Sequence, residues 1–167
     1  VGQRKKYAQG VLSGDAGIGK TAGAIALANE MLGEDKDNNF YEINASDDRK
    51  LETVRTRIKE IASTSKLGDV PFKIILLDEM DGMTKDAQNA LKRIMERYSD
   101  NCRFIITANE PWKIIYPLVS RCAVYHFNHI NDETMKIVLA SVLEQEDVSF
   151  SDTQLEIFIS YLQGDLR

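Results

Sequence analysis

Residues 14–21 read Gly14-Asp15-Ala16-Gly17-Ile18-Gly19-Lys20-Thr21, and this octapeptide sets the expected fold class. Glycines at this spacing before a Lys-Thr pair are typical of a phosphate-binding loop, because the curled backbone points successive N–H groups at anionic oxygens. Residues 7–13 predict a short strand before the loop, and residues 21–32 predict a helix that ends at Gly33. This order predicts that all eight residues bind a nucleoside triphosphate, with an accidental glycine-rich turn as the alternative.

The end of the loop and a later pair of acids carry the expected chemistry. Lys20 is expected to reach the β and γ phosphates, and Thr21 to offer its hydroxyl oxygen to Mg²⁺. Asp78 and Glu79 follow the apolar run of residues 72–77, and parallel sheets bind ligands at the carboxyl ends of their strands. Asp78 would position Mg²⁺ through its water shell, and Glu79 would polarise the attacking water. A surface pair of acids at a helix start is the alternative.

Composition limits the classes of protein that the chain can represent. With 167 residues, 43% of them hydrophobic, the chain can bury one substantial core and a smaller appendage. No apolar run is long enough to cross a bilayer and no cleavable signal pattern opens the sequence, so we expect a soluble protein of an interior compartment. The net charge of -5 indicates that any contact with DNA is local.

The cysteines and histidines are expected to be structural. Cys102 and Cys122 fit small buried hydrophobic residues in a reducing environment better than a disulfide or a metal site. His126 and His129 have no cysteine partners at ligand spacing.

Hydrophobic periodicity predicts an α/β fold. Five candidate strands comprise the run before the loop and the apolar runs at 40–45, 72–77, 102–107 and 123–127. Between these strands, helical spacing of apolar residues predicts two amphipathic helices. The apolar face of the first comprises Leu51, Val54, Ile58 and Ile61. The apolar face of the second comprises Ala87, Leu91, Ile94 and Tyr98. Alternating strands and helices with near-continuous apolar strands indicate a parallel sheet that is covered on both faces.

The pattern changes after residue 127. Residues 132–146 and 151–162 predict two helices with no strand between them, and Ser151 and Gln154 form a capping box at the start of the second. We therefore expect a first domain over residues 1–128 and the beginning of a smaller helical domain over residues 129–167, which is expected to be truncated.

Four further motifs occur together and in order: Asn44-Ala45-Ser46-Asp47-Asp48-Arg49, Asp78-Glu79-Met80-Asp81, Ser120-Arg121-Cys122 and Gly164-Asp165-Leu166-Arg167. With the phosphate-binding loop, they make the chain resemble, from Gly10 to Arg167, the small subunits of replication factor C, the archaeal and eukaryotic sliding-clamp loader. The resemblance implies an AAA+ ATPase core with a five-stranded parallel sheet in the order 5-1-4-3-2. The helical unit would then be the start of the family's lid, and the part before the first strand would be shortened.

The resemblance also implies a function. Such a subunit hydrolyses ATP with Mg²⁺ at subunit interfaces and, with other clamp-loader subunits, opens a sliding clamp and loads it on primer-template DNA during replication. It would work in the cytoplasm of an archaeon or the nucleus of a eukaryote, with no membrane partner. Two alternatives stay open: another AAA+ DNA remodeller such as a branch-migration motor, or a catalytically idle nucleotide-binding subunit.

Four residues acquire roles from the resemblance alone. Asn109 matches the sensor-1 position, which contacts the γ phosphate or orients water. Arg121 would reach the nucleotide of a neighbouring subunit as an arginine finger, and Arg167 falls at the sensor-2 position of the lid. Arg49 aligns with a switch residue that restrains Glu79 until DNA arrives.

Basic residues on two predicted helices are the candidates for DNA contacts, which would grip phosphates without reading bases. They are Lys50, Arg55, Arg57, Lys59, Lys92, Arg93 and Arg97. A solvated helix face is the alternative.

Several residues depart from the family pattern. Asp15, Ala16 and Ile18 are unusual in the phosphate-binding loop, and the carboxylate of Asp15 would repel phosphates unless it faces solvent. Met80 stands where alanine is usual and Lys50 where glycine is usual. The segment Val1-Gly2-Gln3 resembles the family's adenine-pocket residues, but the helix that normally separates those residues from the first strand is largely missing from this sequence.

Overall fold

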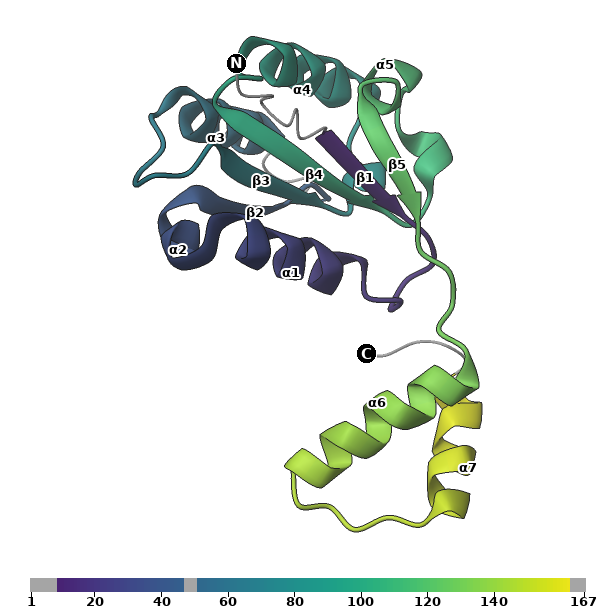
Figure 1. Cartoon of the computed structure of the whole chain (residues 1–167). Coiled ribbons are helices and arrows are strands. Elements are labelled where there is room, and N and C mark those ends of the chain that lie inside the picture. Colours follow the sequence, from purple (N-terminus) through teal and green to yellow (C-terminus); the bar gives the residue numbers. More distant parts are fainter. Residues whose placement is uncertain (1–8, 47–50, 163–167) are drawn as a thin grey trace, which may run out of the picture. The chain divides into compact units, whose positions relative to one another are not determined.

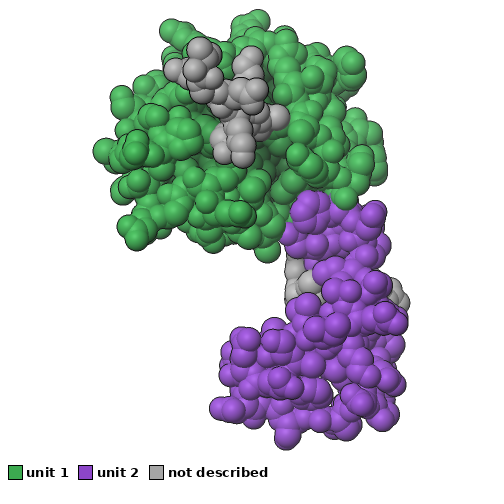
Figure 2. Space-filling view, in the orientation of Figure 1, with its two compact units in different colours: residues 1–14, 20–126 green, residues 15–19, 127–167 purple. Residues whose placement is uncertain are grey.

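The computed structural model describes residues 9–46 and 51–162, with the backbone alone for residues 51–53. The chain divides into two compact units, which Figure 2 shows in different colours. The first unit comprises residues 1–14 and 20–126, and the second comprises residues 15–19 and 127–167.

The first unit is built on a five-stranded parallel sheet (Figure 1). Its strands are β1 (Gln9–Ser13), β2 (Phe40–Asn44), β3 (Lys73–Asp78), β4 (Cys102–Ala108) and β5 (Cys122–His126). They lie in the order β2-β3-β4-β1-β5, with every neighbouring pair parallel. Read from the other edge, this is the order 5-1-4-3-2, so the predicted fold class is confirmed. The strands begin or end within about two residues of the predicted runs, as such boundaries usually do.

Helices cover both faces of this sheet, as Figure 1 shows. One face carries α1 (Lys20–Leu32), followed by η1 (Gly33–Asp35) and α2 (Lys36–Asn39). The other face carries α3 (Leu51–Ser63), α4 (Lys85–Arg97) and the short α5 (Tyr116–Val119). Two short 3-10 turns, η3 (Met80–Gly82) and η4 (Pro111–Lys113), follow β3 and β4.

The main hydrophobic core lies between the sheet and the helices α3, α4 and α5. Strand residues such as Ile75, Leu77 and Phe104 contribute to it and are completely buried. The predicted apolar faces of α3 and α4 contribute Ile58 and Leu91, which are 1% and 2% exposed. The hydrophobic pattern of the sequence therefore placed these helices correctly.

One cation is buried at the amino end of β3. Lys73 Nζ donates hydrogen bonds of 2.9 Å to the carbonyl oxygens of Ile61 and Thr64. These carbonyls belong to the carboxyl end of α3, where backbone acceptors have no partner within the helix. The two hydrogen bonds make the lysine a cap for α3. Burial lowers the pKa of the Lys73 ammonium group.

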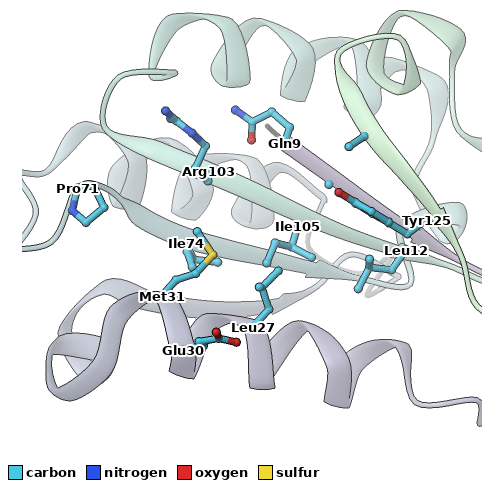
Figure 3. Close-up of a pocket in the computed structure, with 12 residues that line it drawn as sticks. Gln9, Leu12, Leu27, Glu30, Met31, Pro71, Ile74, Arg103, Ile105 and Tyr125 are labelled. Atoms are coloured by element: carbon cyan, nitrogen blue, oxygen red, sulfur yellow. The ribbon is translucent and has the colours of Figure 1, made fainter. Parts of the chain in front are cut away.

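An apolar cavity of about 470 Å³ lies on the α1 side of the sheet (Figure 3). Its lining includes Leu12, Ile105 and Tyr125 from the strands and Leu27 and Met31 from α1. The lining contains none of the loop residues 14–21 and neither acid of the pair that follows the apolar strand, so the cavity is separate from the expected nucleotide site.

The second unit contains α6 (Asp132–Gln145) and α7 (Asp152–Leu162), which pack around Met135, Leu155 and Ile159. The amide of Gln154 donates to Ser151 Oγ at 3.3 Å, and the amide of Ser151 donates to Gln154 Oε1 at 2.9 Å. These reciprocal bonds confirm the predicted capping box. Among the helices of residues 9–46 and 51–162, none is both long and apolar enough to span a bilayer.

Candidate functional site

The candidate site lies where the carboxyl ends of β1, β3 and β4 meet. Because the strands are parallel, the residues that follow them share one edge of the sheet. Gly14 follows β1, Glu79 follows β3 and Asn109 follows β4. Polar residues from distant parts of the sequence are therefore brought together at this edge.

Lys20 connects two of these strand ends. Its Nζ donates hydrogen bonds of 2.8 Å to the carbonyl oxygen of Gly14 and to Asn109 Oδ1. The side chain is nearly buried, with 7% of the residue exposed. Lys20 is the first residue of α1, so its cation lies where the helix dipole also favours an anion.

Three glycines shape the backbone before Lys20. Gly14, Gly17 and Gly19 have φ angles of 144°, 77° and 88°, which L side chains rarely adopt. A Cβ at Gly19 would meet nothing within 4 Å, so the constraint at this position is conformational and not steric. The glycine spacing of the motif therefore corresponds to left-handed backbone positions.

Thr21 and Asp78 form a second polar pair. Thr21 Oγ1 donates a 2.8 Å hydrogen bond to Asp78 Oδ1. The hydroxyl of Thr107, which is 1% exposed, donates to the same oxygen. Hydroxyl and carboxylate oxygens are the ligands that Mg²⁺ prefers, so the donor set fits the metal that the sequence predicts.

Glu79 adopts an uncommon backbone conformation. Its φ and ψ of 54° and 45° are left-handed, which costs a non-glycine residue roughly 1–3 kcal/mol. Its amide donates to Thr107 Oγ1 at 3.0 Å, and its Oε2 accepts from Ser46 Oγ at 3.0 Å. Both bonds fix the acid in this position.

Gly82 packs against the serine that binds Glu79. A Cβ at Gly82 would lie 2.9 Å from Ser46 Cβ, which is closer than real Cβ contacts allow. Ser46 also bonds Asn44 Oδ1, through its hydroxyl at 2.7 Å and its amide at 2.8 Å. The position of Ser46 is therefore set by both the end of β2 and η3.

Asp81 supports the loop that carries Asn109. Its Oδ2 accepts a 3.0 Å hydrogen bond from the amide of Glu110, the next residue after Asn109. Its Oδ1 is buried without a partner, a costly arrangement that indicates a constrained carboxylate.

Sequence reasoning gave no role to Thr107, Ser46 or Asp81. Thr107 had a recognisable signal, because it is a polar residue at the carboxyl end of an otherwise apolar strand. Ser46 and Asp81 were quoted only as parts of family motifs, and their contacts depend on the packing of η3 against two other elements.

Arg121 lies apart from this cluster. It precedes β5, so it lies at the amino ends of the strands, whereas Lys20 lies at their carboxyl ends. Its Nη2 pairs with Glu96 Oε1 at 2.7 Å, and its Nη1 donates to the carbonyl oxygen of Pro117 at 2.6 Å. The side chain is 43% exposed and therefore accessible to another chain.

Five of the candidate DNA-binding residues line one groove between α3 and α4, with a volume of about 600 Å³. They are Arg55, Lys59, Lys92, Arg93 and Arg97. Asp86 is also in the lining, whereas Arg57 is exposed on α3 and is not. The candidates from two helices are thus brought together on one surface.

Three candidate residues, Arg49, Lys50 and Arg167, lie outside the described residues, as does the segment Val1-Gly2-Gln3. The four cysteine and histidine residues are described. Cys102 is buried and Cys122 partly buried. Ser13 Oγ lies 2.7 Å from His126 Nδ1, and Asp15 Oδ2 lies 2.7 Å from His129 Nε2.

Most of the first unit matches a known protein family. The family described as "ATPase family associated with various cellular activities (AAA)" matches residues 11–129. This range includes the phosphate-binding loop, all of β2 to β5 and the acids at the end of β3.

Curated relatives carry a more specific name. The replication factor C small subunit of Methanosarcina mazei is 48% identical over 158 residues, which are 94% of this chain and 47% of that protein. The protein of the same name from Archaeoglobus fulgidus is 48% identical over 165 residues, or 99% of this chain and 52% of that protein. The chain spans about half the length of the curated relatives it matches.

Solved structures share the fold at low identity. A RuvB variant from Thermotoga maritima has a TM-score of 0.71 at 16% identity and covers 91% of this chain and 48% of that chain. A DNA polymerase III gamma subunit-related protein from the same organism has a TM-score of 0.69 at 16% identity, covering 96% of this chain and 51% of that chain. At this identity the similarity concerns the fold alone.

Proposed function

The chain belongs to the AAA family of ATPases, and from this premise we propose that it binds and hydrolyses ATP as part of a clamp-loader small subunit. The observation that carries the proposal is the polar cluster at the carboxyl ends of β1, β3 and β4. There Lys20 bonds Asn109 at 2.8 Å, and the neighbouring Thr21 bonds Asp78 at 2.8 Å.

Lys20 is the phosphate-binding cation in this proposal. Two of its acceptors are a backbone carbonyl and an amide oxygen, which are neutral. Phosphate oxygens carry negative charge and therefore attract the ammonium group more strongly than these two oxygens do. ATP would therefore displace these bonds, with residues 14–21 and Arg167 contributing the remaining contacts and Asn109 oriented toward the γ phosphate.

Thr21 and Asp78 would hold Mg²⁺ beside the phosphates. When bound, the metal supplies positive charge that offsets the charge of the phosphate oxygens. The hydroxyl of Thr107, which donates to Asp78 Oδ1, fixes the carboxylate that this role requires.

Glu79 is the general base of the proposed reaction, accepting a proton from the attacking water. In this structure its Oε2 bonds Ser46, which follows β2. Lys20 and Asn109 follow β1 and β4, on the other side of β3. The Ser46 contact therefore draws the carboxylate away from the phosphate side, which fits a resting state. We retain Arg49 as the proposed switch residue that responds to DNA.

Arg121 would complete the site of a neighbouring subunit. Its position at the amino ends of the strands, opposite to Lys20, argues against service to the nucleotide of its own chain, and its exposure supports service in trans. A guanidinium offsets the charge that builds on the transferring phosphoryl group.

The groove between α3 and α4 is the proposed DNA surface. Five cations against the single acid Asp86 give it a positive balance that suits a phosphate backbone. The predicted contacts from Lys50 and Arg57 remain part of this proposal. The named relatives belong to the family that the sequence resembles, and we therefore propose primer-template DNA and a sliding clamp as partners, over the branch-migration alternative, with this work taking place inside the cell.

The test is ATP hydrolysis by the chain alone, with partner subunits, and then with clamp and primed DNA. We expect stimulation by both ligands. Lys20→Ala should lose ATP binding, whereas Glu79→Gln should keep binding and lose turnover by about 100-fold or more. Unchanged hydrolysis by Glu79→Gln would remove Glu79 from the mechanism, and inactivity under every combination would favour an idle subunit.

A further inference from the structure

The chain has two histidines, and both contact residues that flank Gly14. His126 Nδ1 lies 2.7 Å from Ser13 Oγ, and Ser13 is completely buried. His129 Nε2 lies 2.7 Å from Asp15 Oδ2. The proposed reaction uses neither histidine.

The pairing of Asp15 with His129 has a defined donor. A carboxylate accepts hydrogen bonds and cannot donate them, so the hydrogen of this contact is on Nε2 of the imidazole. The side chains are 71% and 56% exposed. Polar contacts between side chains this exposed contribute little to folding stability, so stability alone gives no reason for the contact.

Asp15 is an unfavourable residue in a loop that binds phosphates, because a carboxylate and a phosphate carry charge of the same sign. It directly follows Gly14, whose carbonyl oxygen accepts from Lys20 Nζ at 2.8 Å. The Asp15 side chain is 71% exposed, and its carboxylate stays clear of a bound polyphosphate as long as it is held toward solvent. His129 is in position to hold it there, because its ring N–H bonds the carboxylate oxygen.

We propose that His129 is a positioning residue of the phosphate-binding loop, which restrains the Asp15 carboxylate and thereby permits tight binding of ATP. The inference rests on the proposed function, because it presumes that residues 14–21 bind phosphates. It assigns a role to a residue of the segment between β5 and α6 that sequence analysis treated as structural.

The inference is tested with a double-mutant cycle on the full chain, with a non-hydrolysable ATP analogue and Mg²⁺ as the probe in titration calorimetry. His129→Ala should weaken binding by about threefold to tenfold, because the variant lacks the hydrogen bond that holds the carboxylate away from the phosphates. Asp15→Asn should bind at least as tightly as the unchanged chain. The double variant should match Asp15→Asn, so the loss disappears when the charge is absent.

His126→Ala is the matched control, because it removes the other histidine beside the loop. Any effect of His126→Ala should be the same with Asp15 or Asn at position 15. An equal loss from His129→Ala in both backgrounds, or no loss in either, would overturn the inference. If the unchanged chain and Lys20→Ala both fail to bind the probe, the proposed function fails and the inference fails with it. Tight binding by the unchanged chain without coupling would reject the inference alone.

Discussion

At the scale of single residues, hydroxyl groups orient the two acids at the end of β3, Asp78 and Glu79. Asp78 Oδ1 accepts from Thr21 and Thr107, and Glu79 Oε2 accepts from Ser46. A hydroxyl group is a neutral donor, so it fixes a carboxylate without offsetting its charge. A lysine or an arginine would fix the carboxylate and offset its charge as well. The printed hydroxyl contacts therefore orient both carboxylates without placing a cation against them.

Ser46→Ala should raise the basal rate of ATP hydrolysis and leave ATP affinity unchanged. The substitution removes the hydrogen bond that draws Glu79 toward β2. Such a bond to a charged group contributes about 1.5 kcal/mol, so a rise of up to about tenfold is expected. Steady-state hydrolysis without DNA is the measurement.

Gly82→Ala should act in the same direction, because its methyl group would displace Ser46. Ser46→Thr, which keeps the hydroxyl, is the control and should retain the low basal rate. A lower basal rate in Ser46→Ala would instead mean that the serine orients Glu79 for catalysis.

The buried thiol of Cys102 should make folding stability fall at alkaline pH. Burial raises the pKa of Cys102 from its ordinary value of 9.0 to about 11. The unfolded chain therefore releases this proton first, and the contribution of the thiol to stability, complete below about 9, is lost as the pH rises toward about 11.

The measurement compares the free energy of unfolding of the unchanged chain with that of Cys102→Ala, in denaturant titrations at several pH values. The difference should shrink between pH 9 and pH 11. Cys122→Ala should behave similarly, since burial also raises the pKa of Cys122 to about 11. A difference that stays constant over this range contradicts the prediction.

At the scale of secondary-structure elements, α3 and α4 each have one face that is buried in the core and another that carries basic residues. Arg93→Ala, in the groove between them, should weaken DNA binding and lower the slope of log affinity against log salt concentration by about 1. Fluorescence anisotropy with primed DNA at several salt concentrations gives this slope. Lys85→Ala, which removes an exposed cation of α4 outside the groove lining, is the matched control and should change it less.

The elements themselves could be predicted from the sequence because their signals are local. Leu91 and Ile94 recur at helical spacing, and β3 is buried along five successive residues, which gives a continuous apolar run. Lys73 is the exception within that run, and its burial depends on carbonyls at the end of α3 that no local pattern reveals.

The candidate site could be predicted only in part. Lys20, Thr21 and Asp78 follow from a motif with fixed spacing and from the acids at a strand end. The contact between Asp15 and His129 spans more than a hundred residues, and neither residue type predicts the other. Contacts of this kind depend on the path of the segment after β5. No periodic pattern in a single sequence predicts that path.

At the scale of the whole molecule, each complete site is expected to need two chains. Arg121→Ala should reduce hydrolysis in the assembled complex by about 1,000-fold, as removal of an arginine finger does. Glu79→Gln should also be inactive. Mixed assemblies of these two variants should recover part of the activity, because some interfaces then combine an intact Glu79 with an intact Arg121.

The recovery is measured as ATP turnover across mixing ratios, with a maximum expected near equal amounts. Glu96→Ala, which removes one of the partners of Arg121 within its own chain and leaves Glu79 and Arg121 intact, is the control and should stay active by itself. Activity that never exceeds that of the separate variants would show that Arg121 does not act across an interface.

The hydroxyl of Thr107 bridges the two acids, since it bonds Asp78 Oδ1 and accepts from the amide of Glu79. Thr107 occupies a strand position whose register is fixed against β1, so the spacing of the acids is inherited from the sheet. Asp78 and the backbone of Glu79 are thus ordered before any substrate arrives, and their ordering entropy is lost once, during folding. Successive turnovers then need no reassembly of this backbone, and at the acid pair only the Glu79 carboxylate has to move, from Ser46 to the attacking water.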